Sequence, residues 1–377
     1  MKFSRKEFLR LGLVGGAGLM LPFGASACGS GLTAGNNSIE GSAGTLLNST
    51  ARLPEPFSVP LLVPPVLEPV RSSANTDYYE LTQKVGQAEI LPDLKTEVWG
   101  YNGIFPGPTI ESRSGRRTVV HHRNELPVPT VVHLHGGRTP PEHDGYPTDV
   151  VLPAGGWHGD HGGHVQLKVI GEGDFEYEYP LDQPAATLWY HDHRMDFTGP
   201  QVYKGLAGFH LIHDGEEEAF GLPHGERDIP LMICDRSFAE GGSFLYPSID
   251  PSLKGKLGVR GEFMSGVLGD CVLVNGVPWP YLEVTNTRYR FRFLNASNAR
   301  RYRVALDPPP REGASFVQVG GDQGLLAEPV PHDTLDIAQA ERFDVIVDFS
   351  AYPLGTEVTL VNEYGRISTS REWISAK

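Results

Sequence analysis

The chain has 377 residues, enough for two or three domains of ordinary size, and its net charge of −14 argues against nucleic acid as a partner. Its 45 glycines and 31 prolines separate short apolar runs. Short apolar runs between turn residues favour an all-β fold over a helical one.

Residues 1–27 have the pattern of an export signal. Basic residues precede an apolar run, Gly12 to Phe23, which is too short and glycine-rich for a good membrane span, and Ala25-Ser26-Ala27 fits a cleavage site. The segment from Ser4 to Arg10 resembles a twin-arginine signal with Lys in the second basic position, and a general secretory signal is the alternative. We expect an exported protein, periplasmic or extracellular, that meets a membrane only if Cys28 is lipid-modified.

Residues 28–75 are rich in Gly, Ser, Asn and Pro, with six prolines between Leu53 and Pro69, and they predict an extended arm. Residues 76–222 predict a first β-sandwich, with turns such as Phe105-Pro106-Gly107-Pro108 between its strands. The strands expected there are Tyr78–Val85, Thr96–Tyr101, Thr118–Arg123, Thr130–Leu134, Gly173–Tyr179, Ala186–Tyr190 and Gly208–His213.

Residues 223–377 predict a second β-sandwich after a linker-like stretch from Pro223 to Pro230. Its expected strands are Ile229–Cys234, Cys271–Asn275, Tyr281–Val284, Arg288–Leu294, Tyr302–Leu306, Phe316–Gly320, Thr334–Ile337, Phe343–Phe349 and Glu357–Asn362. The segment Arg288–Leu294 alternates arginine with aromatic residues, which predicts arginines on the outside and aromatics in the core. The residues from Ile367 onward show no clear closing strand, and little chain remains for a third domain.

Two further features concern both halves of the chain. Each half has a basic-apolar strand that ends in asparagine, at Asn124 and Asn295, which suggests related repeats without establishing them. Cys234 and Cys271 both lie in apolar, strand-like runs. They could pair in an oxidising compartment or remain as buried thiols, and their spacing leaves both alternatives open.

Histidine is concentrated in the first predicted sandwich. Of the 14 histidines, only His332 lies outside the stretch from His121 to His224. Two pairs have a single residue between their members, His133 with His135 and His191 with His193. Alternate side chains of a strand point to one face, so each pair presents two imidazoles together. Four imidazoles could bind copper, zinc, iron or nickel, and a single tetrahedral zinc is one alternative.

The motifs around these pairs resemble those of multicopper oxidases, most closely the branch of spore-coat laccase and bilirubin oxidase. The resemblance runs in order from about residue 76 to about residue 362. In the first half it is carried by Asn102–Ile110, His133-Leu134-His135-Gly136-Gly137, Thr187–His193 and Val202–Ile212. In the second half it is carried by Val274–Gly276, Trp279–Val284, Tyr289–Asn298, Gly320–Leu326 and Ala340–Phe349.

Members of this family have three cupredoxin domains, with a trinuclear copper centre between the first and the third that takes four histidines from each. The resemblance therefore implies two tandem cupredoxin-like Greek-key sandwiches here, the second of the copper-free middle type. It implies that His133 is a ligand of the type 2 copper, and that His135, His191 and His193 are ligands of the type 3 pair. Copper can deliver the four electrons that reduce dioxygen to water, which zinc cannot.

Two acidic residues lie near these ligands. Asp144 falls where relatives place an acid that helps move protons to bound oxygen, although an aspartate before glycine is equally typical of a turn. Asp192 lies between two ligands and should point away from them by strand alternation. The stretch Trp157–His164 is a separate histidine-rich loop for which a solvated role is expected over metal binding.

The sequence departs from the family pattern in one important respect. The His-Pro-x-His-x-His and His-Cys-His runs of the third domain, which complete the trinuclear centre and supply the type 1 copper, do not occur in these residues. We expect an oxidoreductase for phenolic, bilirubin-like or metal-ion donors only when a separately encoded or lost third domain is supplied. The alternatives are an inactive exported module that binds copper or another metal, or one that acts through protein contacts.

Overall fold

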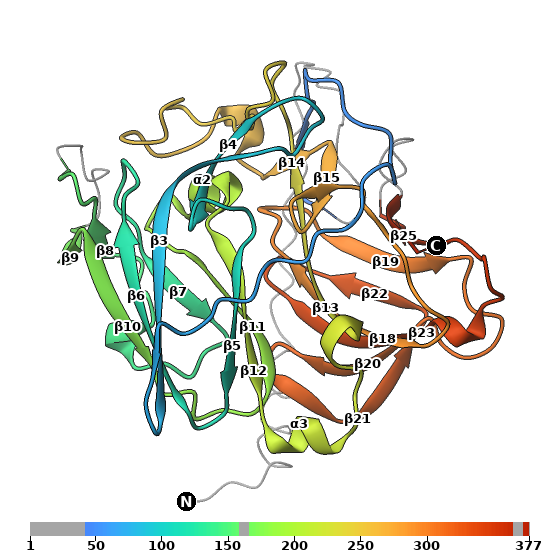
Figure 1. Ribbon diagram of the computed structural model, residues 1–377. Coiled ribbons are helices and arrows are strands. Elements are labelled where there is room, and N and C mark those ends of the chain that lie inside the picture. Colours follow the sequence, from blue (N-terminus) through green and yellow to red (C-terminus); the bar gives the residue numbers. More distant parts are fainter. Residues whose placement is uncertain (1–41, 158–165, 365–371, 377) are drawn as a thin grey trace, which may run out of the picture. The chain divides into compact units, whose positions relative to one another are not determined.

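Strands make up nearly all of the regular structure, which confirms the predicted all-β class. The computed structural model describes residues 42–157, 166–364 and 372–376. The described residues belong to one compact unit, which spans residues 37–377. Figure 1 shows their strands in two successive groups along the chain. The predicted domain boundaries at 75/76 and 222/223 stay predictions.

The first sandwich consists of two sheets. One has the order β10 (Asp174–Tyr179), β6 (Arg117–Asn124), β3 (Thr76–Ala88) and β2 (Arg71–Ser72), with β4 (Thr96–Tyr101) also paired to β3. The other has the order β5 (Gly107–Arg113), β12 (Ala207–His213), β11 (Ala186–Asp192) and β7 (Val132–His135). A small parallel pair joins β8 (Asp149–Leu152) to β9 (Lys168–Glu172).

The second sandwich also consists of two sheets. The larger has the order β16 (Val277–Pro278), β15 (Cys271–Val274), β13 (Asp228–Arg236), β18 (Arg288–Asn295), β23 (Arg342–Asp348), β20 (Phe316–Gly321) and β21 (Gly324–His332). The other has the order β17 (Tyr281–Leu282), β25 (Glu372–Ala376), β24 (Val358–Asn362), β19 (Tyr302–Asp307) and β22 (Thr334–Ile337). Strand β25 pairs with β24, so the expectation of no closing strand was wrong.

Short helices and the arm complete the described structure. Helix α2 spans Thr198–Lys204, α3 spans Gly215–Ala219, and single 3₁₀ turns occupy Pro141–His143, Gly225–Arg227, Gly261–Phe263 and Phe349–Ala351. In the arm, β1 (Thr45–Leu47) pairs in parallel with β14 (Val267–Gly269). None of the described helices could span a lipid bilayer.

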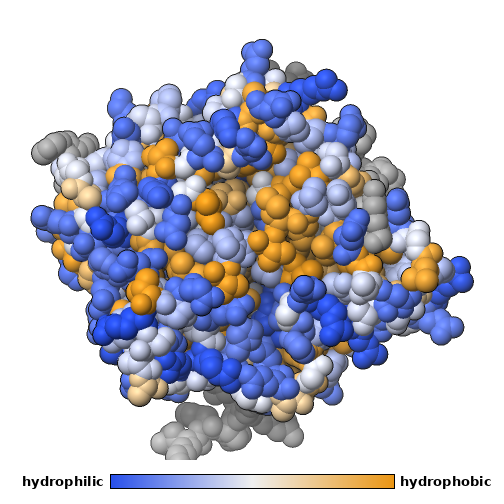
Figure 2. Space-filling view, viewed as in Figure 1, coloured by the Kyte–Doolittle hydropathy of each residue, from blue (hydrophilic) through white to orange (hydrophobic). Residues whose placement is uncertain are grey.

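Apolar side chains also gather at the surface of the arm. The arm crosses the face viewed in Figure 1, and hydrophobic residues are concentrated on that face in Figure 2. In the described part of the arm, residues 42–75, the exposed large apolar side chains are Leu62, Val63, Val66 and Val70.

Strand β11 is buried along its whole length because both of its faces are covered. Leu188 and Tyr190 belong to the core of the first sandwich, whereas Trp189 belongs to the cluster that contains the core of the second. Alternation therefore points Thr187, Trp189 and His191 towards the second sandwich.

Two of the three arginines of β18 are buried, which corrects the prediction that they lie on the outside, whereas Arg288 is exposed as predicted. Arg290 and Arg292 are 2% and 0% exposed. Their guanidinium groups meet Glu217 of α3, Asp228 of β13 and Asp344 of β23. Alternation correctly placed the arginines and the aromatic residues on opposite faces of the strand. Neighbouring elements cover the face that carries Arg290 and Arg292. Buried charges of this kind require opposite charges beside them.

The two strand-ending asparagines make the same hydrogen bonds. The Asn124 amide donates to the carbonyl oxygens of Val128 and Val151, and its side-chain oxygen accepts from the backbone N–H two residues on. The Asn295 amide donates to the carbonyl oxygens of Arg300 and Ile337, and its side-chain oxygen accepts from the backbone N–H two residues on. The parallel pair β3–β6 of the first sandwich also has a counterpart in β13–β18. These parallels support a relation between the two halves.

Cys234 and Cys271 are buried free thiols. In the β13–β15 register, Cys234 lies opposite Leu273 and Cys271 lies opposite Arg236, so the two cysteines are diagonal neighbours. Diagonal neighbours are about 7–8 Å apart, which is beyond the usual span of a disulfide.

Candidate metal centre

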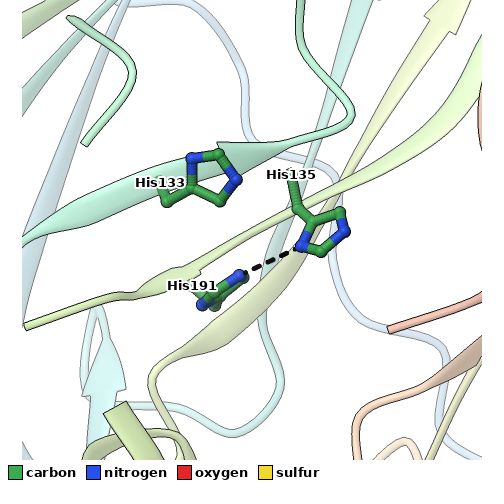
Figure 3. A group of neighbouring side chains, drawn as sticks. All are labelled: His133, His135 and His191. Atoms are coloured by element: carbon green, nitrogen blue, oxygen red, sulfur yellow. Dashed lines mark hydrogen bonds between the residues drawn. The ribbon is translucent and has the colours of Figure 1, made fainter. Parts of the chain in front are cut away.

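The strands β7 and β11 bring three of the four candidate histidines together. They pair antiparallel with His135 opposite Trp189 and His133 opposite His191, so these side chains share one face. The His133 ring centroid lies 5.5 Å from that of His135 and 5.5 Å from that of His191. Figure 3 shows the three rings facing one another, with His135 Nδ1 3.4 Å from His191 Nε2.

The fourth histidine, His193, follows the end of β11. Its backbone N–H donates to the carbonyl oxygen of Val131, which holds it beside β7. Its ring centroid lies 5.4 Å from that of His133 and 5.5 Å from that of His191. Its Nδ1 is buried without a hydrogen-bond partner among the described residues. A buried imidazole nitrogen without a partner is available to ligate a metal.

Hydrogen bonds to backbone carbonyls orient two of the rings. His133 Nδ1 donates to the carbonyl oxygen of Asp144 at 2.5 Å, and His191 Nδ1 donates to that of Asp192 at 2.8 Å. Because a carbonyl oxygen only accepts, both rings carry their proton on Nδ1 and a lone pair on Nε2, which in His191 faces His135 Nδ1 at 3.4 Å. Metal-binding histidines are usually oriented by a bond of this kind.

Lowered pKa values favour the neutral form of three imidazoles, those of His135, His191 and His193, and the neutral form is the one that binds metal. Burial, the charge of Arg342 and the charges of the neighbouring histidines together lower the pKa of His135 to about 4. Burial likewise holds the pKa of His191 well below its ordinary value and lowers that of His193. A cation placed among these rings does not have to displace protons near neutral pH.

Trp189 is part of the site, although the spacing of the histidines did not point to this residue. Its ring stacks on His191, with centroids 4.0 Å apart, and on His135, with centroids 5.3 Å apart. The tryptophan therefore fixes the planes of two candidate ligands from the side of the second sandwich.

Asp144 reaches the cluster through both its backbone and its side chain. Beyond the carbonyl bond to His133, its carboxylate oxygen lies 3.6 Å from His133 Nδ1. Burial raises the pKa of the carboxyl group, while the charges of His133 and His193 oppose the shift. Asp144 also precedes Gly145, whose φ of +75° is a turn conformation. The position of Asp144 is compatible both with a role in proton transfer and with a structural role in the turn.

Asp192 points away from the imidazoles. Its carboxylate oxygens accept from the backbone N–H groups of Val131 and Arg194, both at 3.0 Å, and the side chain is fully buried. Burial raises the pKa of Asp192 to about 7, although these two hydrogen bonds oppose the shift. The residue joins the beginning of β7 to the end of β11.

Arg342 contributes to the site from the second sandwich. Its Nε donates to the carbonyl oxygen of Thr187 at 3.0 Å, and its guanidinium lies against Gly136, which follows His135. The spacing of the histidines carried no signal for this residue. The loop Trp157–His164, apart from Trp157, and the predicted export signal with Cys28 lie outside the described residues.

Comparisons with known proteins identify related sequences and structures. Residues 83–217 match the family model described as "Multicopper oxidase". The chain is 40% identical over 342 residues to a laccase of Bacillus subtilis (strain 168), covering 82% of this chain and 62% of the relative. It is 34% identical over 327 residues to a bilirubin oxidase of Albifimbria verrucaria, covering 82% of this chain and 51% of the relative.

A solved laccase structure from Pediococcus acidilactici has the same fold. It superposes with a TM-score of 0.71 at 35% identity, over 88% of this chain and 63% of that one. The paired sandwiches thus have the cupredoxin fold of multicopper oxidases. The chain contains a multicopper oxidase domain and is homologous to laccases and a bilirubin oxidase, and copper is the metal that this family implies. It spans about 62% of the length of the bacterial laccases it matches.

Proposed function

We propose that this chain supplies one half of a trinuclear copper site that reduces dioxygen to water at the expense of a small reducing substrate. The observation that carries the proposal is the shared face of β7 and β11, at which four imidazoles meet. The ligand nitrogens of His133, His135 and His191 lie within 4.8 Å of one another. That spacing suits bound metal, since unligated rings gain little from turning their nitrogens together.

The residues would take the roles implied by the family. His133 would hold the type 2 copper, and His135, His191 and His193 would hold the type 3 pair. Bound copper would supply the redox chemistry that side chains lack. Trp189 keeps two of the rings in place, and the Asp144 carboxyl group would hold or pass a proton next to His133.

The remaining ligands would come from a further cupredoxin domain outside these residues, on this or another polypeptide. That domain would also supply the type 1 copper, which accepts electrons from a phenolic, bilirubin-like or metal-ion donor. We place the protein outside the cytoplasm, periplasmic or extracellular, in agreement with the predicted export signal.

Copper titration of the purified 377-residue chain tests the proposal. We expect copper to bind at the histidine cluster without an intense blue band and without oxidation of phenols. His191→Asn should abolish this binding. His210→Asn is the matched control, because His210 is a fully buried histidine on β12 that bonds Ser112 outside the cluster.

Three results would count against the proposal. They are copper binding that survives His191→Asn, a blue colour in the isolated chain, and a clear preference for zinc over copper. The last result would favour a metal-binding module without turnover.

A further inference from the structure

We propose that Arg342, from the second sandwich, is a positioning residue for the His135 imidazole. The inference rests on the proposed copper function and extends it to a part of the chain that holds no candidate ligand. It implies that the second sandwich shapes the metal site directly.

The side chain of Arg342 reaches from β23 to the strands that carry the histidines. It donates to three backbone carbonyl oxygens, those of Thr187 on β11 (3.0 Å), Asp322 (2.8 Å) and Ala340 (2.7 Å). Its Nη1 also lies 3.2 Å from the Asp322 carboxylate, and the side chain is 2% exposed. The guanidinium is therefore fixed on several sides and cannot move without breaking buried hydrogen bonds.

The fixed guanidinium packs against the turn that follows His135, at Gly136. Gly136 has a φ of +90°, and a Cβ added there would lie 2.6 Å from Arg342 Nη2 and 2.8 Å from Leu188 Cδ2. The turn thus needs glycine both for its backbone conformation and for the closeness of Arg342. Any displacement of the guanidinium would change the space available to the Gly136 backbone.

The position of His135 depends on this contact between Arg342 and Gly136 because His135 lies at the end of an edge strand. β7 is the last strand of its sheet and pairs only with β11 among the described strands. On its other side, the turn is held by Gln183, whose amide donates to the Gly136 carbonyl oxygen at 3.1 Å. Gln183 and Arg342 together set where β7 ends and therefore where the His135 ring lies.

Lysine could not take the place of Arg342 fully. The three carbonyl oxygens are met by Nε, Nη1 and Nη2 of one planar group, and an ammonium on a flexible stem has no such fork. Arg342→Lys should keep the charge and lose part of the positioning.

The experiment compares three variants of the full chain: Arg342→Gln, Arg342→Lys and the control Arg300→Gln. Arg300 is also a buried arginine of the second sandwich, but it pairs with Asp235 and the Gly269 carbonyl oxygen. Metal-free histidine ring spectra (¹⁵N–¹H) are recorded first, and copper titrations follow. A merely structural role would perturb Arg342→Gln and Arg300→Gln alike.

We expect Arg342→Gln to shift the ring signals of His135 and to weaken copper binding about tenfold. Arg342→Lys should give an intermediate effect, and Arg300→Gln should leave both readouts at wild-type values. Wild-type ring signals in Arg342→Gln, or the same changes in Arg300→Gln, would overturn the inference. Should Arg342→Gln not fold, Arg342→Lys serves in the same comparison with the same criteria. A wild-type chain that binds no copper would refute the proposed function, while the metal-free spectra would still decide the role of Arg342.

Discussion

Replacement of Arg292 by methionine should destabilise the fold strongly, because it opens a buried ionic cluster. The Arg292 guanidinium donates to both carboxylate oxygens of Asp228, at 2.7 and 2.8 Å, to Glu217 at 3.0 Å and to the Thr187 hydroxyl at 3.1 Å. These bonds join the first sandwich, helix α3 and the second sandwich at one side chain.

The size of the effect follows from the charges in the cluster. Two arginines, Arg290 and Arg292, face the carboxylates of Glu217, Asp228 and Asp344, so the formal charge is −1. Methionine in place of Arg292 makes it −2 and leaves Asp228 only a contact of 3.5 Å with Arg290. Removing one partner of a buried ion pair costs about 3–5 kcal/mol, and we expect a loss of this size.

Arg288→Met is the matched control for this substitution. Arg288 lies on the same strand and face, and its guanidinium pairs with Asp348 at 2.9 Å, but its side chain is 71% exposed. An exposed pair contributes less than about 1 kcal/mol. Urea unfolding at pH 7, followed by circular dichroism, measures both variants. Equal losses in the two variants, or a loss below about 1 kcal/mol for Arg292→Met, would refute the reasoning.

The free energies of unfolding of the wild-type protein and Arg292→Met should differ less at acidic pH than at pH 7. Burial raises the pKa of Glu217, but the hydrogen bond from His213 and the charges of Arg292 and Arg290 outweigh it and hold the pKa well below the ordinary 4.5. A carboxyl group with a depressed folded pKa contributes stability above its unfolded pKa, and this contribution is lost as the pH falls through the folded pKa. The cost of Arg292→Met should therefore shrink between pH 7 and pH 3. A cost that is independent of pH would contradict the role given to Glu217.

Three further outcomes are expected. Stability should fall as the pH drops from 6.5 to about 4, because unfolded His135 binds a proton near 6.5 and the folded ring only near 4; His135→Asn should flatten this part of the pH profile measured by urea unfolding. Asn124→Ala and Asn295→Ala should each cost about 2–4 kcal/mol in the same assay, since each leaves several backbone groups unpaired; a large loss in only one would argue against related halves. Cys234 and Cys271 should resist thiol reagents in the native protein and react after unfolding without reductant, as mapped by mass spectrometry; a disulfide-linked peptide would show the thiol assignment to be incorrect.

Most strands were predictable because their signal is local. The strands at Thr96–Tyr101 and Thr334–Ile337 were predicted at their observed bounds, since alternation and turn residues define both ends. Strand β21 was missed because its prolines argue against a strand, although prolines are tolerated at a sheet edge. The helices α2 and α3, with 7 and 5 residues, are too short to show a helical period.

Burial of Arg290 and Arg292 on β18 shows where sequence periodicity stops being informative. A period of two residues separates two faces of a strand, but it cannot say whether solvent or another element covers each face. Arg290 and Arg292 were placed outside because arginine is rarely buried, and the carboxylates that compensate them come from Glu217, Asp228 and Asp344, spread over more than a hundred residues.

One part of the candidate metal centre could be predicted from local sequence, whereas another part is brought together only by the fold. His133 and His135, like His191 and His193, are separated by one residue, so strand geometry was enough to pair them, and family motifs implied that the pairs meet. Arg342 lies about two hundred residues from His135, and only the docking of β23 beside β11 brings the two together. Because Thr187 receives bonds from both Arg292 and Arg342, loosening the ionic cluster should also disturb the strand that carries His191. Copper affinity and fold stability should therefore fall together in Arg292→Met, whereas Arg288→Met should change neither.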